Sequence, residues 1–344
     1  MDATFGRDKQ ALRYKQALIS FRRGRADVAS EHLAAVLDAN PNHAQANYLL
    51  GIIAGINADY EAAEKLFAKA ISIDKHNPHF LFYHGLALFN LGQPCEAMQQ
   101  LDQALNINQN YAEAHYWRGR LLESIGRADD SMASYEKAVQ VRPDYIDALV
   151  AYGNSCYRQY RHKEALALYQ NILSIAPDHA GTYNSMGLVF LYQQKNGSAL
   201  KCFEKAISIK SDFTAAYCGL GEALIRNGRP MEAISAFENA SRLDPGNIAA
   251  SWAARLTLPV LYNSEEEIIS ARERWKMGMY SILSEKPPST QREILESKKA
   301  VAAITNFYLN YQGLDDLEHQ KLFGRLVERV ADVAYPGYAN KDIT

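Results

Sequence analysis

The residue types that most often carry catalysis or bind metals do not stand at the spacings such chemistry requires. The nearest histidines, His76 and His79, have only Asp74 close by and no cysteine, whereas a zinc site needs three or four ligands. Asp129 and Asp130 are adjacent carboxylates in a predicted turn, where aspartate commonly hydrogen-bonds to its own backbone. No serine or cysteine has a general base at a recognisable offset. We therefore expect no metal, no cofactor and no catalysis by this chain alone.

A short glycine motif, Gly219-Leu220-Gly221, has the spacing found in dinucleotide-binding loops. Such loops follow a β-strand and open a helix whose N-terminus holds the phosphates, but no strand-like pattern precedes this segment. Gly221 also belongs to a column of glycines that recurs through the chain. We interpret it as a packing residue and expect no nucleotide site.

That column has a period of 34 residues and is accompanied by three others. Its glycines are Gly51, Gly85, Gly119, Gly153, Gly187 and Gly221. A second small residue recurs at Ala63, Ala97, Ser131, Ala165, Ala199 and Ala233. A large apolar or aromatic residue recurs at Phe67, Leu101, Tyr135, Tyr169, Phe203 and Phe237. A fourth column is Ala70, Ala104, Ala138, Ile172, Ala206 and Ala240. Such a period is typical of a helix-turn-helix solenoid.

The columns have a physical meaning. Each repeat holds two amphipathic stretches with apolar residues at helical spacing. The small residues mark where two helices cross closely, and the large ones fill the space between hairpins, which must stack to bury their surface. In these columns the chain resembles the tetratricopeptide repeat family, whose pattern has a small residue at position 8, Ala at 20, an aromatic at 24 and Ala at 27. The resemblance implies an all-α fold, a right-handed superhelix or α-solenoid.

The pattern divides the chain into a degenerate N-terminal capping repeat (1–43), six repeats (44–247) and a helical C-terminal extension (248–344). In the capping repeat Ala17 replaces the glycine, as expected for a terminal repeat with one solvated side. After the sixth repeat Arg255 stands where glycine is due, so the pattern ends there. We expect the extension to hold a capping helix, a proline-containing linker and further helices.

The composition gives no sign of a nucleic-acid or membrane partner. The formal net charge is −2 at pH 7, so nothing in the balance indicates nucleic acid or a membrane surface as a partner. The four cysteines lack a CxxC spacing, and we interpret them as free buried thiols in a reducing compartment. The N-terminus has no apolar run suited to a signal peptide, and no segment is long enough to span a bilayer. We expect a cytoplasmic protein.

In the tetratricopeptide repeat family the first helix of each hairpin lines a concave groove through positions 2, 5, 9, 12 and 13. Position 5 here reads Tyr14, Tyr48, Phe82, Tyr116, Val150, Asn184 and Cys218, and position 13 includes Arg158 and Arg226. The resemblance implies a groove that holds a peptide or protein segment, with the candidate residues Tyr14, Tyr48, Tyr116, Arg158, Asn184 and Arg226. Alternatively, the position-5 aromatics pack against the next hairpin as core. We leave both readings open for Tyr48 and Tyr116 and favour core for Phe82.

The extension carries a second resemblance. The segments Leu258-Pro259-Val260-Leu261-Tyr262, Asn306-Phe307-Tyr308-Leu309 and Tyr311-Gln312-Gly313 are similar to the junction region of SPINDLY-type relatives of the O-linked N-acetylglucosamine transferases. In that family a tetratricopeptide superhelix presents proteins to two Rossmann-like lobes, which use a nucleotide sugar. No βαβ pattern follows here. If a lobe is missing or sits on a partner, Asn306, Tyr308, Tyr311 and Gln312 are the expected docking surface.

Two functions therefore remain open from the sequence. The first is a non-catalytic interaction module that binds peptide or protein segments in its groove. The second is the substrate-recognition arm and linker of a protein O-glycosyltransferase whose catalytic lobes are missing or belong to a partner. Self-association is a third alternative.

Overall fold

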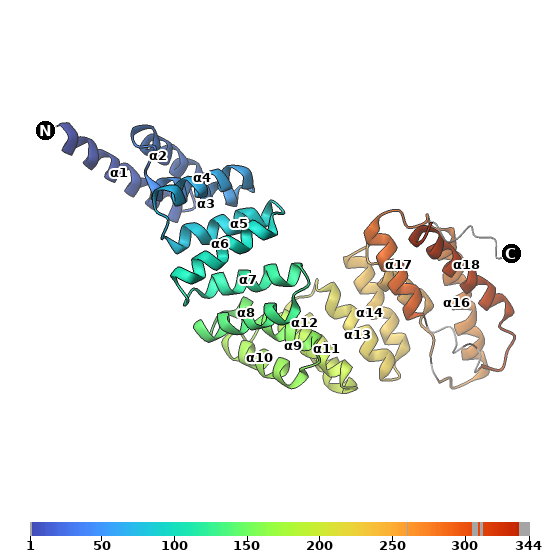
Figure 1. Ribbon diagram of the computed structural model, residues 1–344. Helices are drawn as coiled ribbons and strands as arrows, with labels where there is room; N and C mark the ends of the chain where they lie inside the picture. Colours follow the sequence, from blue (N-terminus) through green and yellow to red (C-terminus); the bar gives the residue numbers. More distant parts are fainter. Residues whose placement is uncertain (1, 260, 305–308, 310–311, 337–344) are drawn as a thin grey trace. The chain divides into compact units, whose positions relative to one another are not determined.

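The computed structural model describes residues 2–259, 261–304, 309 and 312–336, with side chains from residue 10 onward. The regular elements in these ranges are helices, which confirms the predicted all-α class (Figure 1). The chain divides into two compact units, residues 1–161 and 162–344. Within each unit most helices pair as hairpins that pack against their neighbours, which is the architecture of an α-solenoid.

The first unit is built from stacked hairpins. Its helices are α1 (Asp2–Arg22), α2 (Ala26–Ala39), α3 (Ala44–Ile56), α4 (Tyr60–Ile73), α5 (Pro78–Asn90), α6 (Pro94–Ile107), α7 (Ala112–Ser124), α8 (Ala128–Val141) and α9 (Ile146–Arg158). Several begin at residues suited to a helix start. Pro78 and Pro94 occupy the first turns of α5 and α6, where a missing N–H costs nothing, and Asp59 caps α4 by accepting a hydrogen bond from the Ala62 N–H.

The second unit continues the hairpin pattern and ends in the extension. Its helices are α10 (His162–Ile175), α11 (Ala180–Tyr192), α12 (Asn196–Ile209), α13 (Thr214–Arg226), α14 (Pro230–Leu243), α15 (Ile248–Leu256), α16 (Glu265–Ser284), α17 (Gln291–Ala303) and α18 (Leu317–Ala334). Ser264 caps α16 by accepting a hydrogen bond from the Glu267 N–H. A complete capping box, Thr290 with Glu293, opens α17.

The glycine column lies where the two helices of a hairpin cross. A Cβ atom added to Gly51, Gly187 or Gly221 would lie 2.6 to 2.8 Å from the ring of the aromatic residue sixteen positions later, which is closer than atoms can approach. The small residues of the second column are fully buried at the same crossings. Where serine replaces alanine, at Ser131, its hydroxyl donates to the Gly119 carbonyl oxygen at 2.9 Å. The close helix crossing predicted at the small residues is confirmed. The large residues, predicted to fill the space between hairpins, also pack against the glycine of their own hairpin.

A further column with the same period marks the turns inside the hairpins. These residues all have positive φ, between +58° and +78°: Gly24, Ala58, Gly92, Gly126, Tyr160, Gln194 and Gly228. A left-handed residue just after a helix lets the chain reverse and satisfies the last carbonyls; for example, the Gln93 N–H donates to the Leu88 carbonyl. Glycine adopts this conformation without strain, whereas the other three residues do not.

The extension packs onto α15 as one helical cluster. Its apolar core joins Trp252 of α15 to Trp275 of α16 and Leu326 of α18, and all three are almost completely buried. Two helices also cross closely here, but the glycine lies on the other helix of the pair. Arg255 occupies the glycine position on α15, and Gly278 on α16 provides the space, since a Cβ there would lie 2.9 Å from the Arg255 carbonyl oxygen. The arginine that ends the repeat pattern is thus accommodated by a glycine on the opposite helix.

The cysteines are free thiols, as the sequence predicts, but they are not all buried. Cys156 is buried, while Cys95, at the start of α6, is exposed, so its predicted burial is wrong. Across the described ranges, every helix is too short or too polar to traverse a lipid bilayer.

Candidate functional site

The position-5 tyrosines of the first unit are half-buried. Tyr14 packs against the ring of His43, with ring centroids 4.9 Å apart. Tyr48 lies against Phe80 and Tyr83 of the next hairpin, at 4.9 and 5.5 Å between centroids. Burial, followed by the charge and hydrogen bonding of Tyr83, raises the pKa of the Tyr48 hydroxyl. Tyr48 therefore packs between hairpins while keeping part of its surface open.

Tyr116 repeats this arrangement two hairpins further along. Its ring lies 5.7 Å from Trp117, 6.0 Å from Tyr135 and 5.3 Å from Tyr145. It too is half-buried. Phe82, by contrast, is 4% exposed, so its assignment to the core is confirmed. Each of the Tyr48 and Tyr116 rings contacts the adjacent hairpin and still reaches the surface, so both contribute to packing, and their binding role stays a prediction.

The other predicted binding residues fall in different units. Arg158, in the first unit, forms an ion pair with Glu123 of α7 at 2.6 Å. Arg226, in the second unit, donates to the Leu191 carbonyl at 3.2 Å and to Glu222 at 2.5 Å. Asn184, on α11, has an amide oxygen that is buried and finds no hydrogen-bond partner among the described residues. Four candidates thus belong to the first unit and two to the second.

An open cavity of about 240 Å³ lies between α3, α4 and α5 in the first unit. We call it the α3–α5 cavity, and its lining includes Ile52, Gly55, Ile56, Phe67, Leu86 and Asn90. Most of these side chains are apolar, and Ile56 is 65% exposed. Position 9 of the repeat supplies Ile52 and Leu86, and position 12 supplies Gly55. Reading those two columns along the sequence would have identified the cavity walls.

Arg120, at position 9 of the next repeat, continues the same row. Its guanidinium carbon lies 5.2 Å from the Trp117 ring centroid and 6.0 Å from that of Tyr116. It also donates a long hydrogen bond, 3.4 Å, to the Tyr116 hydroxyl, and that bond raises the pKa of the arginine. We call the surface that carries Ile52, Gly55, Ile56, Leu86, Asn90 and Arg120 the first-helix face.

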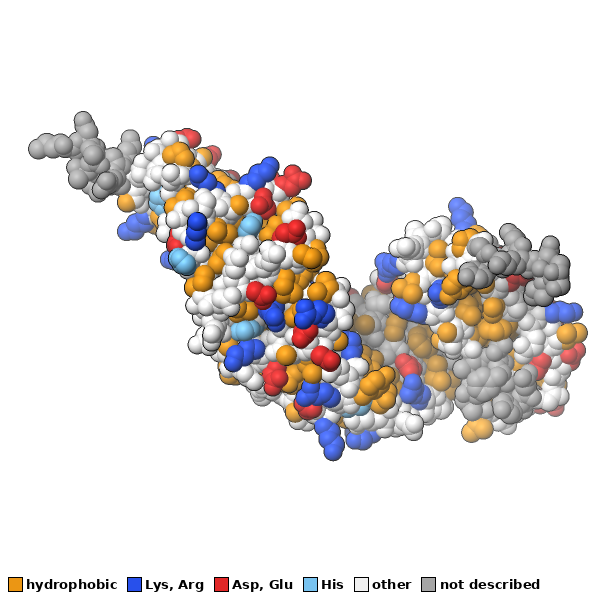
Figure 2. Space-filling model, viewed as in Figure 1, with side chains coloured by type: hydrophobic (Ala, Val, Ile, Leu, Met, Phe, Trp, Pro, Cys, Tyr) orange, Lys and Arg blue, Asp and Glu red, His pale blue; other side chains and the backbone are white. Residues whose placement is uncertain are grey.

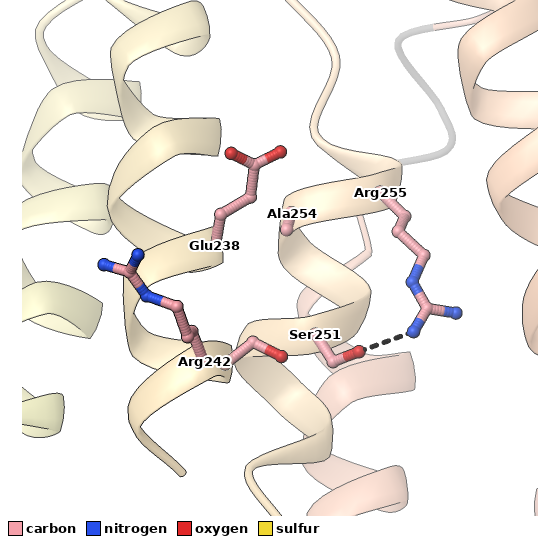
Figure 3. A pocket seen from close by; sticks show the side chains of 6 residues that line it. Glu238, Arg242, Ser251, Ala254 and Arg255 are labelled. Carbon is pink, nitrogen blue, oxygen red and sulfur yellow. Dashed lines mark hydrogen bonds between the residues drawn. The ribbon is translucent and has the colours of Figure 1, made fainter. Parts of the chain in front are cut away.

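A second hollow, of about 350 Å³, lies between α14 and α15 in the second unit (Figure 3). Two arginines line it, but both are held by their own neighbours. Arg255 donates to Ser251 at 2.8 Å and forms an ion pair with Glu285 at 2.6 Å, and Arg242 donates to Asn239. Glu238 adds a carboxylate to the same wall. The Arg242 and Ser251 contacts lie within single helices, and the Arg255–Glu285 pair joins α15 to the end of α16. Because both guanidinium groups are engaged, we do not consider the hollow a binding site.

Of the predicted docking residues in the extension, Asn306, Tyr308 and Tyr311 lie outside the described residues. Gln312 is described, and its amide is used inside the unit. Its oxygen accepts a hydrogen bond from Arg272 at 3.0 Å, and its nitrogen donates to the Tyr262 hydroxyl at 2.7 Å.

The histidine near the α4–α5 turn, His79, is likewise used for packing. Its Nδ1 lies 2.9 Å from the Tyr111 hydroxyl.

Comparison with family models identifies the repeat. Models described as tetratricopeptide repeat match residues 14–78 and 184–255, residues 112–145 and residues 144–212. A model described as TPR repeat matches residues 85–126. Together they cover the hairpins from α1 to α14 with few gaps.

Several solved structures share the fold at low sequence identity. A tetratricopeptide repeat protein from Parabacteroides merdae is 17% identical, with a TM-score of 0.54, and the match covers 79% of this chain and 99% of that one. The C-terminal part of a TPR repeat-containing protein from Cytophaga hutchinsonii is 19% identical, with a TM-score of 0.56 and coverages of 70% and 98%. PilF of Pseudomonas aeruginosa is 15% identical, with a TM-score of 0.55 and coverages of 61% and 96%. A sequence search against curated proteins gave no match. With its 34-residue columns, its hairpins and these family models in agreement, the chain belongs to the tetratricopeptide repeat family.

Proposed function

We propose that this protein is an interaction module that binds peptide or protein segments along the first-helix face of its repeats. The observation that carries the proposal is the α3–α5 cavity, an apolar hollow on a surface otherwise lined by half-buried aromatic rings. When a partner covers exposed apolar side chains such as Ile56, their removal from water favours binding. Rigid aromatic rings supply contact area at little cost in conformational entropy.

The surface chemistry supports a protein partner. On the face drawn in Figure 2, hydrophobic, acidic and basic side chains are interspersed over both units, without an extended patch of one sign. A nucleic-acid surface would concentrate lysine and arginine. We accordingly propose protein or peptide partners. We also propose a cytoplasmic location, as expected from the sequence.

The organisation that we propose follows the sequence pattern. Residues 1–43 act as the N-terminal cap, residues 44–247 as six repeats, and residues 248–344 as an extension that covers the last hairpin. The stacked hairpins would wind into the right-handed superhelix typical of the family, with the first helices on its concave side.

We further propose that the chain binds without chemistry of its own. Gln312, which the transferase-arm alternative would leave free for a catalytic lobe, is engaged by Arg272 and Tyr262, and Leu309 beside it is fully buried. The engaged amide of Gln312 and the burial of Leu309 both favour an extension that packs on itself. Incubation of the purified chain with a nucleotide sugar and acceptor peptides should give no transfer; detectable turnover would support the transferase reading instead.

Binding is tested by panning a randomised displayed-peptide library on the full-length chain and measuring enriched peptides by fluorescence anisotropy. Ile56→Glu places a charge on the first-helix face and should weaken binding at least about tenfold. The matched control is Ile107→Glu at the end of α6, also partly exposed but in a second helix, and it should bind normally. Failure to enrich any peptide above an unrelated protein would contradict the proposed function.

A further inference from the structure

The α3–α5 cavity has the size and chemistry of a pocket for one large apolar side chain. Its volume is about 240 Å³. Roughly eight water molecules occupy this volume in the liquid, at about 30 Å³ each. The wall side chains Ile52, Phe67 and Leu86 offer water no hydrogen bonds. Asn90, also in the lining, is partly satisfied by donating to the Leu86 carbonyl at 2.8 Å.

One of the glycines that line the cavity, Gly55, faces open space. An added Cβ at Gly55 would find no atom within 4 Å, unlike Gly51 one turn earlier, which is held against the Phe67 ring. Gly55 is therefore not required by packing within the hairpin. Its effect is to leave space between α3 and α5, beside the exposed Ile56.

The next repeat places a cation further along the first-helix face. Arg120 on α7 is exposed and forms no ion pair with any described residue. The neighbouring carboxylates are already paired, Glu123 with Arg158 and Glu113 with Arg142. A ligand carboxylate would therefore meet an available guanidinium that is oriented by the rings of Trp117 and Tyr116.

Aromatic contacts connect the two features. Trp117 of α7, which carries Arg120, lies 5.9 Å from Phe89 of α5, and α5 also supplies Leu86 to the cavity. Axes of neighbouring helices lie about 8–10 Å apart, and an extended chain advances about 3.3 Å per residue. Because the cavity lies between α3 and α5, about one and a half helix spacings, roughly 12–15 Å, separate it from α7. Less the reach of the Arg120 side chain, one bound segment spans this distance in about three or four residues.

We propose that the first-helix face selects segments in which a bulky apolar side chain is followed or preceded, about three or four residues away, by a carboxylate. The apolar side chain fills the α3–α5 cavity, and the carboxylate, from Asp, Glu or a chain terminus, pairs with Arg120. This inference rests on the proposed function and specifies which segments that function accepts.

The test uses peptides enriched from the randomised library on the full-length chain, fluorescently labelled and measured by anisotropy. Gly55→Leu fills the cavity with a side chain that also favours helix. Arg120→Glu reverses the charge. Gly197→Leu on α12 is the matched control, because a Cβ there also finds no atom within 4 Å. Circular dichroism and thermal unfolding establish that each variant is folded.

The proposal predicts enriched peptides with the apolar–acidic pair, and binding about tenfold weaker or more for Gly55→Leu and for Arg120→Glu, with Gly197→Leu unchanged. Replacing the peptide's acid by its amide should weaken binding to the native chain but not to Arg120→Glu. Enriched peptides that lack the pair, or that bind all three variants equally, would overturn this inference and leave the proposed function standing. No enrichment on the native chain would overturn both.

Discussion

A Cβ atom on Gly119 would lie 2.5 Å from Cε1 of the Tyr135 ring, the residue sixteen positions later on the partner helix of the same hairpin. Tyr135 itself is fully buried, and its hydroxyl donates to Glu123 at 2.7 Å. Glycine at one column and a large ring at the other are thus two halves of one contact, which explains why both recur with the same period.

Replacing Gly119 by leucine should force α7 and α8 apart and cost about 1–3 kcal/mol or more of unfolding free energy through overpacking. Urea unfolding followed by circular dichroism measures the loss. The control is Gly324→Ala on α18, where an added Cβ meets nothing within 4 Å; it should be neutral or stabilising by about 0.5–1 kcal/mol. Equal stability of Gly119→Leu and the native chain would refute the crossing role.

At a turn of positive φ inside a hairpin, a substitution by glycine should stabilise the fold. Ala58 has φ of +59°, a conformation that costs a non-glycine residue about 1 kcal/mol. Ala58→Gly should therefore raise the unfolding free energy, although the greater freedom of glycine in the unfolded chain offsets part of the gain. Gly92→Ala, at the equivalent turn with φ of +73°, should lower it. The comparison fails if both substitutions shift the urea midpoint in the same direction.

Tyr48 should contribute to stability as well as to binding, because its ring packs against Phe80 and Tyr83. Truncation to alanine is expected to cost about 2 kcal/mol, less than for a fully buried ring. Tyr48→Phe keeps the ring and loses only the hydroxyl, so its cost should stay within about 1 kcal/mol. Thermal unfolding of both variants checks this; an unchanged melting temperature for Tyr48→Ala would mean that the ring is not part of the packing.

Stability should fall at mildly acidic pH because of His319 on α18. Burial and the charge of Arg272 lower its pKa below the ordinary value of 6.5, against the opposing influence of Asp316 and Glu318. As the pH falls through 6.5, the unfolded chain takes up a proton that the folded chain does not, so the unfolding free energy decreases. The decrease ends when the folded imidazole is also protonated. Urea midpoints measured from neutral to mildly acidic pH should show a steeper decline for the native chain than for His319→Gln. Identical declines would contradict the assignment.

The hairpins were predictable because their determinants are local and repeated. The columns of Gly119 and Tyr135 specify which helices cross, and the structure has that contact. The position-5 tyrosines were harder, because the sequence cannot show how much of a ring the next hairpin covers. The α3–α5 cavity could have been located from the position-9 and position-12 columns, but its volume depends on how far α3 and α5 stand apart.

The extension was less predictable for a different reason. Its helices and the Ser264 cap follow from local pattern. The network around Arg272 joins residues 40 to 47 positions apart: Gln312, Asp316 and His319. Contacts at such separations depend on how α16 and α18 pack, and no repeat column reports on that packing.

Site-specific photo-crosslinking tests most directly whether the first-helix face binds the partner. A photoreactive amino acid replaces Asn90 on α5 or, as a control, Gln99 on α6; both positions are exposed and polar. With a library-selected peptide bound to the full-length chain, the account predicts crosslinks from position 90, competed by unlabelled peptide, and none from position 99. Crosslinks from position 99 alone would contradict it.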